Sequence, residues 1–385
     1  MVPALRVVHA FNMANDAYMI TKGLRRLGAD AELIIEKPSH VASLPQWEDA
    51  EIDLGKVADP YNPDWNVLNE HWTIPNWIHV WEASRSWYPS RMLRWASLLR
   101  MLEPYDLVVG HVPFAKCAIL CRKPYVIYDA GWIRYLRMNR RGYRLGRWGY
   151  RHASRIIFTN VDTYEMFLQQ GYDPERLEFS PFAIDTDQYS PGRSHLGLSV
   201  DHDFMVFSPA RHEWQEKGND RLIKAFSSLL KTSPKALLVM VEWGSDLVRS
   251  KNLVASLGIE RSVSWESLMN KKRLIEWYRL ADVVADQFVL GAYGTTAPEA
   301  MSCAKPVLMY VEDRYFQRWH GSLPPILSAR SVDGIHEMLE KLKDPAFRSE
   351  VGRKGRDWVL KEHRLTTVAQ TQLKIYHEVL EEISR

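Results

Sequence analysis

The chain has few cysteines: only Cys117, Cys121 and Cys303 occur among its 385 residues. An odd and sparse set excludes a disulfide framework and is typical of a reducing compartment. Cys117 and Cys121 stand four residues apart, but no His or Cys cluster in the sequence completes a metal site around them,. Both are therefore expected to be small buried apolar residues, and the protein is expected to be cytoplasmic.

Long apolar runs and a strong charge of one sign are also missing. No stretch of 18 apolar residues occurs, so the sequence predicts no transmembrane helix,. The first 13 residues are strand-like and lack the features of a secretion signal, so none is expected,. The formal net charge is only +3, which does not indicate a general polyanion-binding protein. With 385 residues and 46% apolar content, two or three ordinary globular domains are expected.

In the first half, short apolar runs alternate with helical patterns. Strands are predicted at 5–10, 31–35, 106–110, 125–128 and 155–159, and helices at 16–27, 114–120, 133–152 and 163–170. This alternation predicts a parallel, doubly wound sheet. Residues 37–104 break the rhythm and are rich in Pro, Asn and Trp, so they are interpreted as an insertion. Its tryptophans could stack on sugar rings, contact lipid or form a small satellite core.

In the second half the same rhythm begins again after a linker at 185–200. Strands are predicted at 204–208, 236–241, 263–265, 283–289 and 306–310, with helices starting at 219, 245, 270 and 298 and closing helices at 332–342, 346–362 and 366–383. The expected domains are 1–184 and 201–365, with a last helix at 366–385 that returns to the first domain. Ligands of such sheets bind beyond the carboxyl ends of the strands, so a two-part substrate is expected in a central cleft that the two domains face.

One short stretch, "GAYGTTAPEAMSCAKPVL" (Gly291–Leu308), follows an apolar strand and opens a helix. Thr296 and Glu299 have the spacing of a capping box, in which both side chains serve the helix start. Alternatively, the turn offers free backbone N–H groups to a phosphate, and Glu299 accepts hydrogen bonds from ribose hydroxyls. The local pattern leaves both readings open.

A second stretch, "SPARHEWQEKGNDRLIKAF" (Ser208–Phe226), places Arg211 and Lys217 directly after a strand. A guanidinium and an ammonium at that position can bind a diphosphate, the first by bidentate bonds and the second as a point charge. The alternative is a solvated loop in which Glu213 and Glu216 neutralise the cations.

These two stretches and "AIDTDQYSP" (Ala183–Pro191), in this order and spacing, resemble the GT-B retaining glycosyltransferases of family four. The resemblance covers most of residues 105–385. It implies two Rossmann-like domains of α/β class, Arg211 and Lys217 on the donor diphosphate, and Glu299 on the donor ribose. It also implies phosphate and sugar contacts from Gly294, Thr295 and Thr296. Asp185–Asp187 lies in the linker and is read as structural rather than as a metal motif, and no metal or other cofactor is expected.

Two positions depart from the family pattern. Gly291 stands where the family carries a further Glu that contacts the donor sugar, so that contact is expected from Asp286, Gln287 or Tyr293, or is lost. Asp129 follows the strand at 125–128, where many members have a His, and could act as a base or orient the acceptor; alternatively it caps a helix. His111 ends the strand at 106–110 and is a further catalytic candidate.

Asn12 and Asn15 replace the glycines that family members often carry in the first βα turn. They could donate to phosphate or sugar, or simply cap the helix. Eight arginines and no acid lie between Trp132 and Arg155. Trp132, Arg134, Arg137, Arg141 and Arg144 are the candidates for an acceptor or anionic-membrane surface. A solvated basic helix is the alternative, and nucleic acid is a less favoured partner.

The expected function is transfer of a sugar from a UDP-, GDP- or ADP-linked donor to the hydroxyl of a glycan or lipid-linked acceptor, with retention. Peripheral membrane contact on the cytoplasmic face would accompany a lipid-linked acceptor. The alternative is an inactive protein of the same fold that binds membrane or nucleic acid through the Arg-rich segment, as the replacements at Gly291 and Asp129 would allow.

Overall fold

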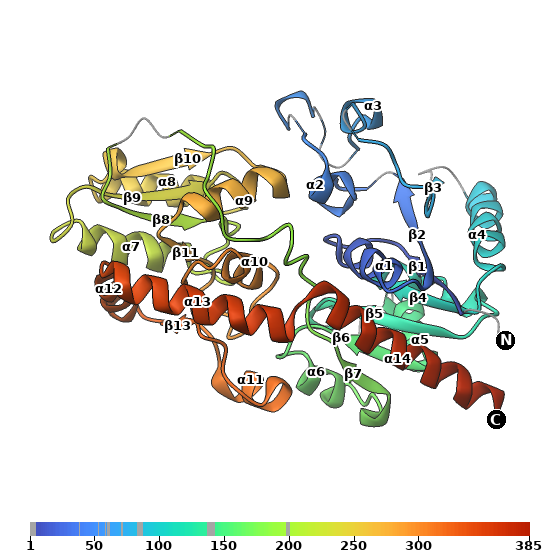
Figure 1. Ribbon diagram of the computed structural model, residues 1–385. Helices are drawn as coiled ribbons and strands as arrows, with labels where there is room; N and C mark the ends of the chain where they lie inside the picture. The colour runs from blue at the N-terminus through green and yellow to red at the C-terminus, as the bar shows by residue number, and fades with distance from the viewer. Residues whose placement is uncertain are drawn as a thin grey trace. The chain divides into compact units, whose positions relative to one another are not determined.

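The structure is a computed structural model, and it describes residues 5–37, 39–52, 54–57, 59, 62–70, 72–82, 88–136, 143–197 and 201–385. The chain forms two compact units. The first comprises residues 1–183 together with 365–385, and the second comprises residues 184–364. Each is an α/β unit built on one parallel sheet (Figure 1), so the predicted fold class is confirmed.

The sheet of the first unit has seven strands in the order β3-β2-β1-β4-β5-β6-β7, all parallel. The strands are β1 (Arg6–Ala10), β2 (Asp30–Lys37), β3 (Ile78–Glu82), β4 (Leu107–His111), β5 (Tyr125–Asp129), β6 (Arg155–Phe158) and β7 (Leu177–Phe179). Its helices are α1 (Asp16–Arg26), α2 (Gln46–Asp49), α3 (Trp65–Leu68), α4 (Tyr88–Leu102), α5 (Arg144–His152), α6 (Tyr164–Gln169) and α14 (Leu365–Ser384). Strands β4 and β5 are buried along their whole length, which explains their continuous apolar runs.

The segment predicted to be an insertion contributes to the sheet. β3 lies inside it and pairs with β2 as the edge strand. Its tryptophans pack against protein rather than standing free: Trp77 stacks on Tyr18 of α1 with ring centroids 5.6 Å apart, and Trp81 contacts Phe11 and Trp95. These contacts support the satellite-core reading of the Trp-rich segment.

The last helix, α14, packs against α1 within the first unit. The close approach depends on Gly23 of α1, because a Cβ at that position would lie 2.9 Å from Ala369 Cβ and 3.0 Å from the Leu365 carbonyl oxygen. A buried polar chain also links α14 to the sheet: Gln372 donates to Ser180 Oγ (2.9 Å), and the Tyr376 hydroxyl donates to Gln372 Oε1 (2.7 Å). This polar chain and the small residue fix the helix on the first unit.

The second unit has a six-stranded parallel sheet in the order β10-β9-β8-β11-β12-β13. The strands are β8 (Phe204–Ser208), β9 (Ala236–Val241), β10 (Val263–Glu266), β11 (Val283–Ala285), β12 (Val307–Met309) and β13 (Leu327–Ser328). The helices are α7 (Asn219–Leu229), α8 (Leu247–Ser256), α9 (Lys271–Leu280), α10 (Thr296–Ser302), α11 (Asp313–His320), α12 (Val332–Lys341) and α13 (Pro345–Glu362). The chain order reverses between β8 and β11, which makes their carboxyl ends the switch point of this sheet.

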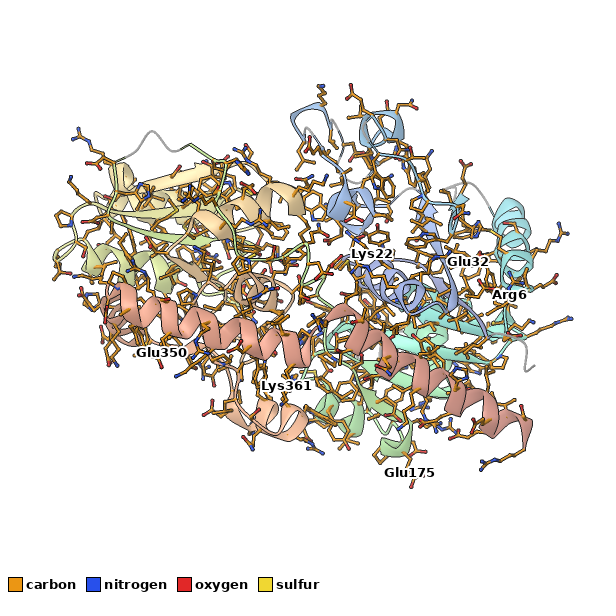
Figure 2. The ribbon with its side chains drawn as sticks, in the orientation of Figure 1. Arg6, Lys22, Glu32, Glu175, Glu350 and Lys361 are labelled. Atoms are coloured by element: carbon orange, nitrogen blue, oxygen red, sulfur yellow. The ribbon has the colours of Figure 1, made fainter. Side chains whose placement is uncertain are left out.

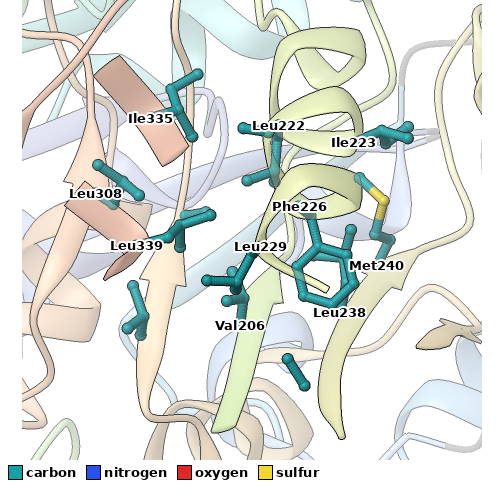
Figure 3. Packing of buried hydrophobic residues seen from close by; sticks show 14 of the residues in the cluster. Val206, Leu222, Ile223, Phe226, Leu229, Leu238, Met240, Leu308, Ile335 and Leu339 are labelled. Carbon is teal, nitrogen blue, oxygen red and sulfur yellow. The ribbon is translucent and has the colours of Figure 1, made fainter. Parts of the chain in front are cut away.

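One face of this sheet is closed by an apolar core with α7 and α12 (Figure 3). Val206 of β8 and Leu238 of β9 pack there against Phe226 of α7 and Leu339 of α12. The opposite face carries α9, since Phe207 of β8 stacks on Trp277 with ring centroids 5.5 Å apart. Successive residues of one strand thus pack on opposite faces of the sheet. Polar groups follow at the carboxyl ends of the strands.

The helix predicted at 133–152 is broken. Asp129 caps a short 3₁₀ turn, η5 (Trp132–Arg134), and α5 begins only at Arg144. Residues 137–142 lie outside the described part, and with them Arg137 and Arg141. Gly149 lets α5 approach η3 (Val112–Lys116), because a Cβ there would lie 2.2 Å from the Ala115 carbonyl oxygen.

Charged side chains cover the outside of both units, as Glu175, Glu350 and Lys361 illustrate in Figure 2. None of the helices in the described ranges combines the length and apolarity needed to span a bilayer.

Candidate functional site

The loop after β8 carries Arg211 and Lys217 at the switch point of the second sheet. Gly218 ends the loop in a left-handed conformation (φ 69°), which glycine adopts without steric cost. The Asn219 side chain then holds the loop from inside: its Oδ1 accepts from the Glu213 amide (3.1 Å), and its Nδ2 donates to the Ala210 carbonyl (3.4 Å). The cations are therefore presented by an ordered turn.

A second loop, after β9, supports the first. The His212 amide donates to the Trp243 carbonyl (2.8 Å), and the Trp214 amide donates to Asp246 Oδ2 (2.9 Å). Gly244 has φ 109°, and a Cβ there would lie 2.5 Å from the His212 nitrogen. The β8 loop is consequently held from the β9 side by bonds that do not involve the Arg211 and Lys217 side chains.

Arg211 contacts two carboxylates of its own loop. Its Nη2 lies 2.8 Å from Glu213 Oε2 and 3.2 Å from Glu216 Oε2, and the side chain is 38% exposed. Its Nε is buried and has no hydrogen-bond partner within the described part of the chain. Glu213 and Glu216 thus pair with this cation through Nη2, as the alternative prediction expected, while its Nε donor is unused.

Lys217 joins the β8 loop to the loop after β11. Its Nζ donates to Gln287 Oε1 (2.9 Å), and the Phe288 amide donates to the Lys217 carbonyl (2.8 Å). The Gln287 amide nitrogen in turn donates to the Ala292 carbonyl. Both amide atoms of Gln287 are therefore engaged, and its oxygen positions Lys217 at the junction of the two loops.

Glu299 lies in the first turn of α10 and is almost completely buried, at 3% exposure. Lys271 donates to its Oε1, and the Tyr278 hydroxyl donates to its Oε2 (3.0 Å). Both partners come from α9. The capping-box prediction is wrong: Thr295 rather than Thr296 is the N-cap, and no side chain caps the helix. Glu299 instead turns toward α9.

Lys271 is a site residue that the sequence reading missed. It is 28 residues from Glu299 in the chain and belongs to another helix. No local spacing pattern connects the two positions, and the sequence around Lys271, "MNKKRLIEWY", shows only an ordinary basic helix start. The structural role of Asn219 was also missed. Its partners are backbone atoms of the preceding loop, and residue types do not reveal such contacts.

Asp286 follows β11 directly and is 5% exposed. Within the described part of the chain its carboxyl group accepts no hydrogen bond and forms no ion pair. Burial raises the pKa of Asp286; nearby Lys217 opposes this rise, and the charge of Glu299 adds to it. Four charged groups, Lys217, Asp286, Glu299 and Lys271, therefore interact beside one edge of the sheet.

The turn between β11 and α10 contains several residues that were predicted to bind the donor, and some of them contact protein groups instead. Tyr293 is buried, and its hydroxyl lies 2.8 Å from His363 Nε2, so it faces α13. Gly291 packs against Glu312: a Cβ at 291 would lie 2.5 Å from Glu312 Cβ. A glutamate at 291 could not be accommodated in this conformation. Gly294, Thr295 and Thr296 are half-buried at the start of α10, and their ligand role stays a prediction.

In the first unit, Asn12 and Asn15 are engaged within the protein. Asn12 Nδ2 donates to Asn15 Oδ1 and to the Ser43 carbonyl, both at 2.7 Å, and Asn15 Nδ2 donates to the Ala42 carbonyl (3.1 Å). Asn15 has φ 63° and Ala14 has φ 49°, a region that disfavours side chains other than Asn, Asp and Gly. The asparagines hold this strained turn against residues 41–43, which supports the structural reading.

His111 and Asp129 end neighbouring strands as predicted, but both are buried. His111 is 1% exposed, and its Nε2 lies 3.2 Å from Nδ1 of His9. Burial lowers the pKa of His111, and the adjacent His9 adds to this effect. Burial thus disfavours the charged form of His111, and its catalytic role stays a prediction.

The Asp129 carboxylate accepts three hydrogen bonds from protein donors. It accepts from the amides of Gly131 (2.6 Å) and Ile133 (3.1 Å) and from the Tyr150 hydroxyl (2.6 Å). Burial raises the pKa of Asp129, while these hydrogen bonds lower it. The geometry is that of a cap that fixes η5, and the catalytic role of Asp129 stays a prediction without structural support.

Three of the five residues predicted to form the basic-aromatic surface lie in the described part of the chain. Arg134 forms a bidentate pair with Asp162, at 2.5 Å and 3.0 Å, and is mostly buried. Trp132 packs on Tyr135 and Tyr143. Arg144 is exposed at the start of α5, next to Leu145, which is 53% exposed. Arg137 and Arg141 lie outside the described residues.

A hollow of about 580 Å³ lies in the first unit between α4 and the loop before β5. It is lined by Leu99, Arg100, Ile119, Leu120 and Lys123 among others. No residue predicted to bind the donor contributes to it. Across the described ranges, His, Cys, Asp and Glu side chains form no group of three or more that could hold a metal ion.

Comparison with known proteins finds a family model and curated relatives that match part of the chain. Residues 197–315 match the family model described as "Glycosyl transferases group 1". Among curated proteins, D-inositol 3-phosphate glycosyltransferase of Nocardia farcinica is 32% identical over 169 residues, which is 40% of this chain and 37% of that protein. The enzyme of the same name from Corynebacterium jeikeium is 28% identical over 168 residues, 40% of each chain. These matches span only about two fifths of the curated relatives.

Solved structures extend the likeness to the whole fold. Anabaena HepE, solved in complex with UDP and glucose, has a TM-score of 0.72 at 15% identity and covers 97% of this chain and 99% of its own. Sucrose-phosphate synthase from Thermosynechococcus elongatus has a TM-score of 0.67 at 15% identity over 98% of this chain and 100% of its own. The chain therefore has the GT-B fold. These matches do not favour the alternative of an inactive binding protein.

Proposed function

We propose that the protein transfers a sugar from a nucleotide-diphosphate donor to an acceptor hydroxyl with retention. The match of residues 197–315 to the model described as "Glycosyl transferases group 1" supports this proposal. One observation carries the proposal. Arg211 and Lys217 stand in one loop at the switch point of the sheet, and Lys217 is joined to the β11 loop, which leads to buried Glu299. Open α/β sheets bind their ligands at such switch points.

In the proposed mechanism the protein supplies charge and position. As the bond between the sugar and the diphosphate breaks, Arg211 and Lys217 take up the negative charge that develops on the leaving oxygen. The acceptor oxygen forms its bond to the same face of the sugar, and the departing phosphate accepts the hydroxyl proton. The two cations carry the diphosphate charge, so the proposed reaction requires no metal ion.

Glu299 holds the donor ribose in this proposal. Lys271 and Tyr278 use one acceptor position on each of its oxygens, and a carboxylate oxygen has two lone pairs. Its remaining lone pairs can accept the two ribose hydroxyls. Because the side chain is held by α9, the ribose acceptor is already in place before the donor arrives.

A UDP-linked sugar is the first donor to test, because HepE, which shares the fold, is described in complex with UDP and with UDP-glucose. GDP- and ADP-linked sugars stay within the proposal. A glycan or a lipid-linked molecule is the proposed acceptor, and the cytoplasmic location expected from the sequence stays a prediction.

The Glu299→Gln variant tests the donor site. An amide carries no charge and offers only one acceptor oxygen, so the variant should bind the nucleoside diphosphate at least 10-fold more weakly, since hydrogen bonds to charged groups contribute about 1.5–3 kcal/mol each. Calorimetry with UDP, GDP and ADP measures the effect. Unchanged affinity for the nucleotide that binds wild-type protein would reject the ribose role of Glu299.

We also propose that exposed α5 residues contact anionic lipid when the acceptor is lipid-linked. Arg144 and Arg151 are exposed on α5, with exposed Leu145 beside Arg144. The double variant Arg144→Ala/Arg151→Ala should weaken cosedimentation with vesicles of anionic phospholipid, at about 1 kcal/mol for each basic residue.

The matched control is Arg353→Ala on α13, whose exposed side chain pairs with Asp357. Binding of the wild type should fade as salt rises. If wild type ignores the vesicles, the membrane proposal fails. If the wild type instead binds DNA in a gel-shift experiment, with an affinity that falls steeply as salt rises, nucleic acid is the partner.

A further inference from the structure

Asp286 is a charged residue at the switch point whose carboxyl group has no protein partner among the described residues. Its side chain is 5% exposed and, among the residues that the structure describes, has no hydrogen-bond or ion-pair partner. A buried carboxylate without partners is costly, and most buried polar groups in proteins are hydrogen-bonded. Arg211 Nε, in the neighbouring loop, also lacks a partner, so unpartnered polar groups of both signs at this switch point indicate a ligand that supplies the missing bonds.

The position of Asp286 at the end of β11 determines which face of the sheet its side chain lies on, and that face is the one with the proposed donor site. Val283 and Ala285 of β11 belong to the apolar core on the α7 side. Side chains alternate along a strand, and the Asp286 amide continues the ladder by donating to the Leu308 carbonyl (3.2 Å). Its side chain therefore lies on the other face, where α9 contributes Tyr278, and the charges of Lys217 and Glu299 both act on it.

Gln287 and Tyr293, the other two side chains predicted to replace the missing sugar contact, are engaged within the protein. Both amide atoms of Gln287 are used, by Lys217 and by the Ala292 carbonyl. The Tyr293 hydroxyl is paired with His363. Gly291 has no side chain and no room for one beside Glu312. Of the three residues predicted to contact the sugar, Asp286 is thus the one whose side chain has no protein partner among the described residues.

We propose that Asp286 binds hydroxyl groups of the transferred sugar. The inference rests on the proposed function, which assigns Arg211 and Lys217 to the diphosphate. A sugar attached to that diphosphate offers hydroxyl donors, and an ionised carboxylate is purely an acceptor. The charge of Lys217 favours the ionised form of Asp286. Asp286 thereby supplies selectivity for the sugar, whereas Glu299 supplies affinity for the nucleoside.

The Asp286→Asn variant separates sugar binding from nucleotide binding. Calorimetry is run with three matched pairs: UDP and UDP-glucose, GDP and GDP-mannose, ADP and ADP-glucose. The variant should bind the free diphosphate within about twofold of wild type, whereas its affinity for the matching nucleotide sugar should fall about 10- to 100-fold, the range of hydrogen bonds to a charged group. Asp286→Ala should show the same pattern.

The melting temperature provides an independent test. If Asp286 had a structural role, its replacement would lower the melting temperature, whereas a ligand-binding role predicts a rise. The pKa of Asp286 is raised in the fold by burial and by Glu299, against Lys217, so its ionised form destabilises the folded state above the unfolded value of about 3.9. Asp286→Asn should therefore raise the melting temperature at pH 7, and the gain should shrink as the pH falls toward 4. The groups facing Asp286 are Lys217, Glu299 and Tyr278.

Asp282, four residues earlier, is the matched control. Its carboxylate accepts from the Met205 amide (2.8 Å) and pairs with Arg348 (3.1 Å), so Asp282→Asn should lower stability and leave the ratio of nucleotide-sugar to nucleotide affinity unchanged. If Asp286→Asn lowers stability or keeps the wild-type affinity ratio, the inference is overturned while the proposed function stands. If wild-type protein binds no member of any pair, the proposed function fails and the inference with it.

Discussion

Replacing Lys217 with alanine should lower the rate of sugar transfer about 10²- to 10³-fold, the usual cost of removing one preorganised stabiliser of developing charge. Lys217 Nζ is held by Gln287 at the end of β11, so its charge is in place before the donor binds. Arg211→Ala should have an effect of similar size. Release of the nucleoside diphosphate from the donor in the presence of acceptor measures the rate.

Lys224→Ala provides the control for the loss of a lysine in the same region. Lys224 lies on α7 and pairs with Asp220 at 3.1 Å on the surface, where ion pairs contribute little. Its loss should leave the rate unchanged. If Lys217→Ala and Arg211→Ala both retain more than about a third of wild-type activity, which is far from the expected loss, the diphosphate assignment is wrong.

Lys271→Met should lower the free energy of unfolding by about 3–5 kcal/mol, because it leaves Glu299 as a buried carboxylate without its cation. The Lys271 and Glu299 side chains are only 13% and 4% exposed, so water cannot replace the lost partner. Urea denaturation of the purified protein measures the change. Lys272→Met, at the exposed neighbouring position, should cost less than about 0.5 kcal/mol.

A double variant distinguishes a paired charge from ordinary packing. In Lys271→Met/Glu299→Gln neither charge remains, and the Tyr278 hydroxyl can still donate to the amide oxygen. Part of the lost stability should return, as measured by a double-mutant cycle. If the two substitutions simply add, the ion pair seen between α9 and α10 does not stabilise the fold.

The strands of both sheets could largely be predicted because buried parallel strands give continuous apolar runs, as in β4, β8 and β9,. The misses have physical causes. β3 carries His79 and Trp81 at the sheet edge and is half-buried, so its sequence lacks the apolar run. The helix predicted at 133–152 depended on arginine spacing, but Asp129 ends the strand by capping η5, and the described helix starts only at Arg144.

The candidate site also has a part that could be predicted from the sequence and a part that could not. Arg211, Lys217 and Glu299 could be placed near one another because strand ends of a parallel sheet share an edge. Their partners could not: Lys271 reaches Glu299 from another helix, and Gln287 reaches Lys217 across 70 residues. The positions of His111 and Asp129 at strand ends were predictable, but their burial and their hydrogen bonds to protein groups depend on distant residues such as His9 and Tyr150.

A structure of the full chain with the nucleoside diphosphate that it binds most tightly tests the central claim most directly. We predict that the diphosphate lies within hydrogen-bond distance, about 2.7–3.2 Å, of Lys217 Nζ and the Arg211 guanidinium, with both ribose hydroxyls on Glu299. A nucleotide bound away from the carboxyl ends of β8 and β11, or a ribose that leaves Glu299 untouched, would contradict the account.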